Sequence, residues 1–127
     1  MFQGLRTVVY AVSDLAKAAE WYTQVLGQPP YFSEPYYVGF NVGGFELGLD
    51  PDTTGVVRGN NAVAYWGVPD ARAAFDRLVS LGAREAKAVA DYGGGIKGGS
   101  VVDPFGNVFG VLENPHFGAG PHPPQGE

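Results

Sequence analysis

The sequence has 127 residues, and few of its side chains belong to the types that perform most enzyme chemistry. It contains no cysteine, which excludes thiol nucleophiles, disulfides and cysteine-bound metals. The two histidines, His116 and His122, lie at or beyond the end of the last strand-like stretch, beside or within a segment rich in proline and glycine. We therefore interpret both as surface residues rather than as metal ligands.

Among the carboxylates, Glu46 is the strongest candidate for a functional role. It lies in the alternating stretch FELGLD, residues 45–50, where every second side chain points to the same face of a strand. Glu46 would then lie on the opposite face from Leu47. In the preceding strand, Tyr37 and Asn41 belong to a polar set that faces a cavity or solvent. Glu46 is either a ligand anchor, a general base or an exposed strand carboxylate.

Two similar stretches provide the framework for these residues. VVYAVSDLAKAAEWYTQVLG (8–27) and VAYWGVPDARAAFDRLVSLG (63–82) each read as a strand, a capping Asp, an amphipathic helix and a glycine. We predict helices near Asp14–Leu26 and Asp70–Leu81. Strand-like stretches follow each helix, so the fold class is α+β, built from paired βαβββ modules.

The modules define the domain organisation. Module one covers residues 5–52 and module two covers 61–115, and together they form a single domain over 1–117. A polar linker separates them. The Pro/Gly-rich tail over 118–127 has no apolar pattern, and we expect it to be disordered.

Composition excludes several classes of partner. The formal net charge of −5 argues against nucleic acid and against anionic membrane surfaces. No stretch approaches the roughly 18 apolar residues of a transmembrane helix. The N-terminus lacks the apolar region of a signal peptide, so we expect a cytoplasmic protein.

The order of these motifs resembles the vicinal oxygen chelate superfamily, which includes glyoxalase I, bleomycin resistance proteins, fosfomycin resistance enzymes and extradiol dioxygenases. The resemblance covers roughly residues 5–114 and rests on the two repeated stretches and on DPFGNVFGVLENP at 103–115. It implies a curled eight-stranded mixed sheet around a cleft, with the helices on the outer face. It also implies a homodimer.

Enzymes of that superfamily hold a divalent metal in the cleft. Their four ligand positions fall here on Thr7, Glu46, Val63 and Gly110, and only Glu46 carries a strong metal-binding group. We therefore expect no metal and no other cofactor. Beside apolar Val63 and Val108, Glu46 would lose water, which would raise its pKa.

If the strand face that carries these four positions points into the cleft, the cleft is lined mainly with small and apolar residues, as is typical of small-molecule sites. Tyrosines in it could stack on a planar ligand. Trp66 is expected in the core, and Trp21 at a dimer contact or at the rim. The predicted ligand-binding residues are Thr7, Tyr37, Asn41, Glu46, Val63, Tyr65, Tyr92, Val108 and Gly110.

The function we predict is that of a metal-independent small-molecule-binding protein, sequestering an aromatic or drug-like ligand in the manner of bleomycin resistance proteins. The alternative is a glyoxalase-like lyase or isomerase in which Glu46 is the base and Tyr65 donates or orients a proton. A third hypothesis is an accessory domain without a ligand of its own.

Overall fold

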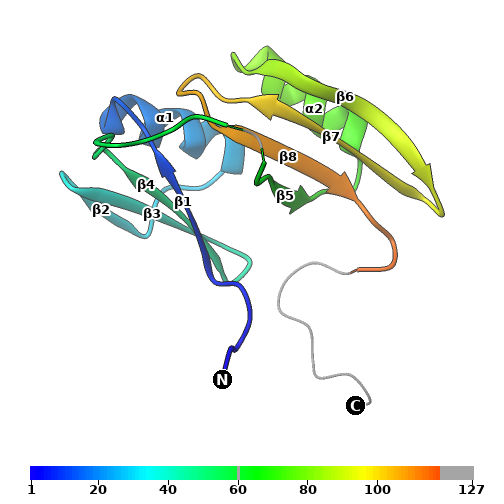
Figure 1. Ribbon diagram of the computed structural model, residues 1–127, viewed down its shortest axis with the longest axis horizontal. Helices are drawn as coiled ribbons and strands as arrows, with labels where there is room; N and C mark the ends of the chain where they lie inside the picture. Colours follow the sequence, from blue (N-terminus) through cyan, green and yellow to red (C-terminus); the bar gives the residue numbers. More distant parts are fainter. Residues whose placement is uncertain (60, 118–127) are drawn as a thin grey trace. The chain divides into compact units, whose positions relative to one another are not determined.

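The computed structural model describes residues 1–59 and 61–117 (Figure 1). Contacts divide the chain into two compact units, whose boundary lies between Val56 and Val57. We call residues 1–56 the N-terminal unit and residues 57–117 the C-terminal unit. The predicted disordered tail, with His122, lies outside the described residues.

Each unit contains one helix and one four-stranded sheet, in the order strand, helix, three strands. In the N-terminal unit, the sheet order is β1-β4-β3-β2, with β1 parallel to β4 and the other pairs antiparallel. Its elements are β1 (Thr7–Ala11), α1 (Leu15–Leu26), β2 (Phe32–Glu34), β3 (Tyr37–Val42) and β4 (Phe45–Asp50).

The C-terminal unit repeats this plan with the sheet order β5-β8-β7-β6, again with a parallel first pair. The α+β class and the two βαβββ modules are thereby confirmed. The closure of both sheets around one cleft stays a prediction. The elements are β5 (Ala64–Gly67), α2 (Ala71–Ser80), β6 (Arg84–Gly93), β7 (Ile96–Val102) and β8 (Val108–Glu113).

Both helices begin where the sequence predicts. The carboxylates of Asp14 and Asp70 accept hydrogen bonds from backbone N–H groups three residues later, at 3.1 and 3.0 Å. Each bond satisfies a donor that has no partner inside the helix. Gly27 ends α1 with a φ of 70°, the left-handed conformation that glycine adopts most easily.

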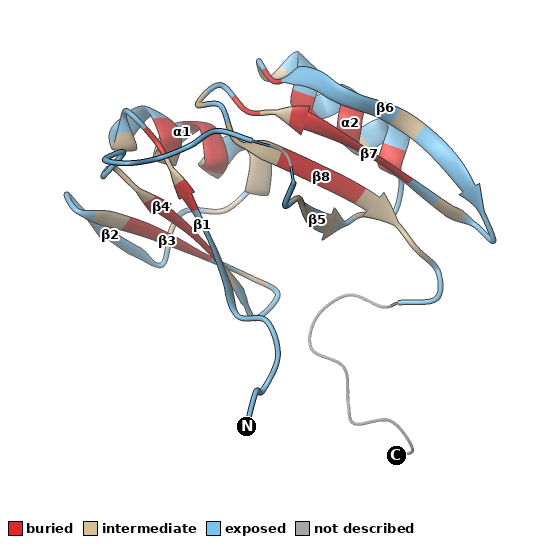
Figure 2. Ribbon diagram, viewed as in Figure 1, coloured by how far each residue is buried: buried red, intermediate tan, exposed pale blue. Residues whose placement is uncertain are grey.

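The N-terminal sheet buries the face that packs on α1 and exposes part of the other. Figure 2 shows buried residues along β3 and on α1. The buried residues Val38, Phe40, Leu47 and Leu49 are at most 3% exposed. The opposite face, which we call the open face, follows from strand register. Its members are Thr7, Val9, Ala11, Phe32, Glu34, Tyr37, Gly39, Asn41, Glu46, Gly48 and Asp50.

The expectations for Trp21 and Trp66 need correction, and the exposure of Tyr36 is a further observation. Trp21 is buried, with its ring edge-on to Tyr22 at a centroid distance of 4.8 Å, so it does not mark an exposed contact surface. Trp66 stacks on Phe109 at 5.2 Å but is only half-buried. Tyr36 is 66% exposed because it lies in the turn before β3 rather than within the strand.

One turn of the C-terminal unit is held by a buried carboxylate. The buried carboxylate of Asp103 accepts hydrogen bonds from the N–H groups of Phe105 and Asn107, at 2.9 and 2.7 Å. Asp103 therefore shapes the turn between β7 and β8. Strand β6, at the outer side of this sheet, is exposed along almost its whole length. In the described residues, no helix is both long and apolar enough to cross a membrane.

Candidate functional site

Glu46 is the centre of a hydrogen-bonded cluster on the open face. The hydroxyl of Thr7 donates to Oε1 of Glu46 at 2.9 Å, and the phenol of Tyr31 donates to Oε2 at 2.5 Å. The Glu46 side chain is half-buried, whereas Tyr31 is 64% exposed. The carboxylate is thus held from two sides while the cluster still faces outward.

Backbone pairing brings these side chains together. The parallel register of β1 and β4 places Thr7 beside Glu46, and the Glu46 N–H donates to the carbonyl of Arg6 at 2.8 Å. The N–H of Tyr31 donates to the carbonyl of Gly39 at 3.0 Å, so the chain is already paired with β3 one residue before β2 begins. This pairing carries the Tyr31 phenol across β3 to Glu46.

Two glycines leave the space that the cluster occupies. A Cβ at Gly39 would lie 2.7 Å from Oε2 of Glu46 and 3.0 Å from Cε1 of Tyr31. A Cβ at Gly48 would overlap the hydroxyl of Tyr37. Both glycines lie on the open face, and their lack of a side chain lets the two tyrosines lie across the sheet.

The hydrogen bonds determine the charge state of the carboxylate. Donation from the Tyr31 phenol lowers the pKa of Glu46 below its ordinary value, and donation from Thr7 and Tyr37 adds to this; partial burial opposes it. The expectation of a raised Glu46 pKa is therefore wrong. The reason is that Glu46 exchanges water for three hydroxyl donors rather than for apolar neighbours.

The phenols respond in the opposite direction. Burial and the nearby charge of Glu46 raise the pKa of Tyr37 to about 12. The hydrogen bond to Glu46 also raises the pKa of Tyr31. At neutral pH the cluster therefore holds one charged carboxylate and two neutral phenols. A carboxylate has about four lone-pair positions, so Glu46 can accept further hydrogen bonds from a ligand.

The donor set around Glu46 does not fit a transition metal ion. Its neighbours are hydroxyl groups, whereas such ions in proteins are held by several imidazole, thiolate or carboxylate ligands. Within residues 1–59 and 61–117, no three His, Cys, Asp or Glu residues gather closely enough to bind one.

Of the predicted binding residues in the N-terminal unit, Thr7, Tyr37 and Glu46 come together. Asn41 lies opposite Glu46 in the register of β3 and β4, but its side-chain oxygen accepts from the N–H of Gly44 at 3.0 Å. Its amide therefore stabilises the β3–β4 turn.

The remaining predicted residues belong to the C-terminal unit. Tyr65 and Gly110 are partners in the register of β5 and β8, and a Cβ at Gly110 would lie 2.6 Å from Cδ1 of Tyr65. The Tyr65 ring thus occupies the space above Gly110. Val63 precedes β5, Val108 begins β8 and Tyr92 lies on the exposed β6.

Sequence reasoning missed Tyr31 as a member of the site. It follows the loop Gln28-Pro29-Pro30 and precedes β2, so strand alternation gave it no defined face. The available signal was that a hairpin rich in aromatic residues comes shortly before the strand in which Glu46 alternates with apolar residues. That signal could suggest a tyrosine partner for Glu46 but not which of the three tyrosines.

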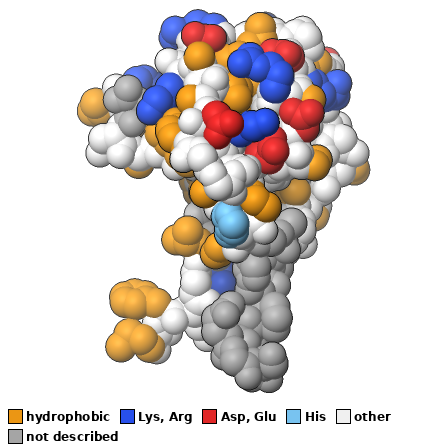
Figure 3. Space-filling model, turned by 90° about the vertical axis from the view of Figure 1, so that its right-hand side faces the viewer, with side chains coloured by type: hydrophobic (Ala, Val, Ile, Leu, Met, Phe, Trp, Pro, Cys, Tyr) orange, Lys and Arg blue, Asp and Glu red, His pale blue; other side chains and the backbone are white. Residues whose placement is uncertain are grey.

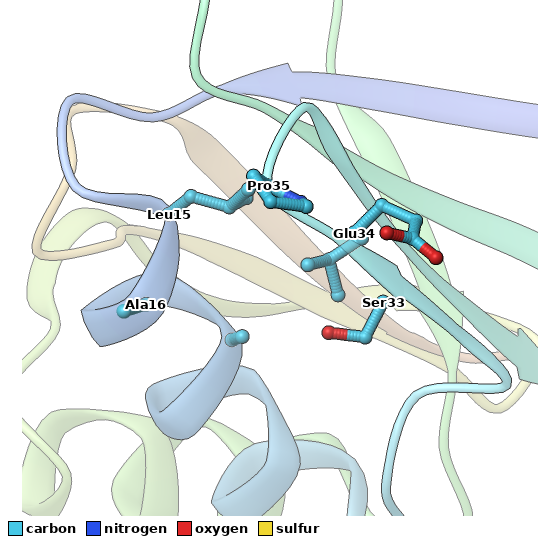
Figure 4. Close-up of a pocket in the computed structure, with 7 residues that line it drawn as sticks. Leu15, Ala16, Ser33, Glu34 and Pro35 are labelled. Carbon is cyan, nitrogen blue, oxygen red and sulfur yellow. The ribbon is translucent and has the colours of Figure 1, made fainter.

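A second feature of the N-terminal unit is a shallow groove of about 450 Å³ on the helix side of the sheet (Figure 4). In Figure 4, Leu15 and Pro35 lie next to each other, while the Ser33 hydroxyl and the Glu34 carboxylate point in different directions. No polar groups converge inside it, so the cluster around Glu46 is the stronger candidate. The groove is lined by Leu15, Ala16, Ala19, Ser33, Glu34, Pro35 and Val38.

His116 has a structural contact. Its Nε2 atom lies 2.8 Å from the carbonyl oxygen of Gly94, in the turn between β6 and β7. The side chain therefore joins the end of the C-terminal unit to that turn, and His116 is exposed, as predicted.

Comparisons with known proteins identify the fold. The model of the glyoxalase/bleomycin resistance protein/dioxygenase superfamily matches residues 4–111. No curated protein is significantly similar. A glyoxalase-related enzyme from Fulvimarina pelagi is 22% identical over 90% of both chains, with a TM-score of 0.73. A glyoxalase/bleomycin resistance protein from Catenulispora acidiphila is 23% identical over 88% of this chain and all of the other (100%), with a TM-score of 0.66.

The substitution Tyr31→Phe should raise the pKa of Glu46, because the Tyr31 hydrogen bond is the largest influence that lowers it. Carboxyl carbon shifts in an NMR titration would report the change. Tyr36→Phe is the matched control, since Tyr36 is an exposed hairpin tyrosine outside this hydrogen bond. An equal Glu46 pKa in wild type and Tyr31→Phe would contradict the cluster.

Because the pKa of Glu46 is lowered in the folded protein, the free energy of unfolding should depend on pH. The ionised Glu46 stabilises the fold above its ordinary pKa, and this contribution is lost as the pH falls through the lowered value. The loss should be smaller in Tyr31→Phe, as measured by denaturant unfolding at several pH values.

Gly48→Ala should destabilise the protein by about 1–3 kcal/mol, the usual cost of overpacking, because the new methyl group collides with Tyr37. Gly67→Ala, which meets no atom within 4 Å, is the control and should be neutral or mildly stabilising. Chemical unfolding measures both. In a Tyr37→Ala background Gly48→Ala should cost much less; an unchanged cost there would show that Tyr37 does not lie over Gly48.

Proposed function

The chain belongs to the glyoxalase/bleomycin resistance protein/dioxygenase superfamily, and we propose that within it the protein binds a small molecule without a metal. The proposed binding surface is the open face of the N-terminal sheet, with Glu46 as its polar anchor. The ligand is aromatic or drug-like, and its sequestration rather than its conversion is the function.

The observation that carries the proposal is the charge state of Glu46. Its pKa is lowered by hydroxyl donors, and both phenols beside it have raised pKa values. The carboxylate is therefore ionised and already oriented before a ligand arrives. An oriented charged acceptor forms strong hydrogen bonds with a donor on the ligand and loses little freedom on binding.

The same observation disfavours the lyase or isomerase alternative. A general base works best when its pKa lies near the working pH, which for a glutamate requires a raised value. The donors around Glu46 change its pKa in the opposite direction.

Metal independence is part of the proposal and follows from the donor types. Of the superfamily's four ligand positions, Thr7, Val63 and Gly110 lack strong metal ligands, and Glu46 is bonded to hydroxyl groups. Protein purified without chelators should contain no stoichiometric transition metal by elemental analysis.

For the binding function, a small-molecule library screened by thermal shift should yield ligands that raise the melting temperature. Glu46→Gln should weaken those that donate a hydrogen bond by about tenfold to a hundredfold, as expected for a charge-assisted bond. Glu20→Gln, an equal charge change on the exposed side of α1, is the control. Calorimetric titration gives the affinities, and unaltered binding of every such ligand to Glu46→Gln would refute the assignment.

We also propose a homodimer, because large apolar side chains remain exposed in both units. Val9, Tyr65 and Phe117 are 52%, 49% and 70% exposed, and association would remove apolar surface of this kind from water. Sedimentation at micromolar concentration should give a dimer. A monomer under those conditions would contradict the homodimer proposal but not the proposed binding site around Glu46.

A further inference from the structure

The formal charge of the chain is concentrated in one unit. The N-terminal unit has six carboxylates and two cations, a balance of −4 out of the total of −5. The C-terminal unit has six of each. Figure 3 shows such mixing on one face of the molecule, where Lys and Arg lie next to Asp and Glu. A positively charged ligand would therefore be attracted mainly to the N-terminal unit.

The charge is also distributed unevenly within the N-terminal unit. None of its four strands contains Lys or Arg. Glu34, Glu46 and Asp50 all lie on the open face by register. Of the two cations, Lys17 lies on α1, and the guanidinium of Arg6 contacts carbonyls of its own N-terminal segment. Within the described structure, no cationic side chain of these strands competes for Glu46.

Tyr31 and Tyr37, beside Glu46, belong to a cluster of aromatic rings. Phe32 is their centre: its ring centroid lies 6.2 Å from those of Tyr36 and Tyr37 and 6.4 Å from that of Tyr31. Phe32 is 37% exposed, and Tyr31 and Tyr36 are about two-thirds exposed, at 64% and 66%. Solvent therefore reaches the aromatic cluster as well as the carboxylate.

We propose that Glu46 and the rings of Tyr31, Phe32 and Tyr37 together bind the ammonium group of an organic cation, a protonated or quaternary amine. The proposal rests on the binding function proposed above and specifies the class of its ligand. Aromatic faces carry negative potential and attract cations within about 6 Å of the ring centroid. Glu46 supplies the full negative charge.

Competing ligand classes fit the cluster less well. An anion would be repelled by Glu46 and by the other carboxylates of the open face. A transition metal ion needs several strong ligands, and the carboxylate has hydroxyl neighbours. A neutral aromatic molecule could stack on the rings but would leave the charge of Glu46 unused. An organic ammonium ion uses both features.

The test compares two probes of the same shape, choline and its neutral isostere 3,3-dimethylbutan-1-ol, titrated at millimolar concentrations. Choline should shift the backbone amide NMR signals of β2, β3 and β4. The isostere should bind at least about threefold more weakly, because it lacks the positive charge that the aromatic faces and Glu46 attract. Equal affinity for both probes, or choline shifts confined to other elements, would overturn the proposal.

Substitutions separate the two parts of the site. Glu46→Gln and Phe32→Leu should each weaken choline binding by about threefold to thirtyfold, within the range for loss of a charge or of a cation–π contact. Glu20→Gln should leave it unchanged. In the wild type, choline affinity should be constant near neutral pH and fall as Glu46 is protonated, which provides a test without any variant. A pH-independent affinity down to the unfolding limit would count against the role of Glu46.

The titrations also distinguish failure of the ammonium assignment from failure of the proposed small-molecule-binding function. If library compounds bind the open face but choline does not, the ammonium assignment fails and the binding function stands. If neither choline nor any library compound shifts the signals of the open face, both fail.

Discussion

A carboxylate that is partly removed from water must receive hydrogen bonds from the protein, and in this molecule that constraint organises one face of a sheet. Glu46 is half-buried and is bonded to hydroxyl groups from β1 and from the segment before β2. The parallel pairing of β1 with β4 and the early pairing of Tyr31 with Gly39 are both needed to deliver those donors. Strand register is therefore the origin of the site's electrostatics.

The two units treat corresponding positions differently. On β4, Glu46 remains and Gly48 makes room for Tyr37. On β8, Gly110 stands where the superfamily resemblance implies a metal-binding Glu, and the ring of Tyr65 lies over it. In each unit a tyrosine thus lies across a glycine of the parallel-paired strand, but only the N-terminal unit keeps a carboxylate beside the ring.

The framework of the fold was predictable because its signals are local. Capping by Asp14 and Asp70, the glycine after α1 and strand alternation depend on neighbours in the sequence. The site was only partly predictable. Tyr31 lies outside a strand, and its contact with Glu46 depends on pairing across β3, which no local pattern encodes. The wrong sign expected for the Glu46 pKa has the same origin, because the direction depends on which groups replace water.

One outer strand has a consequence for solubility. β6 is ten residues long and exposed, and an edge of that kind can template unwanted pairing with other chains. Its ladder with β7 is interrupted between Glu85 and Lys87, between Lys87 and Ala90, and between Asp91 and Gly93. Such irregularities, with charged side chains between them, oppose continuous strand addition. The C-terminal unit can thus keep a long exposed hairpin with little tendency to aggregate through it.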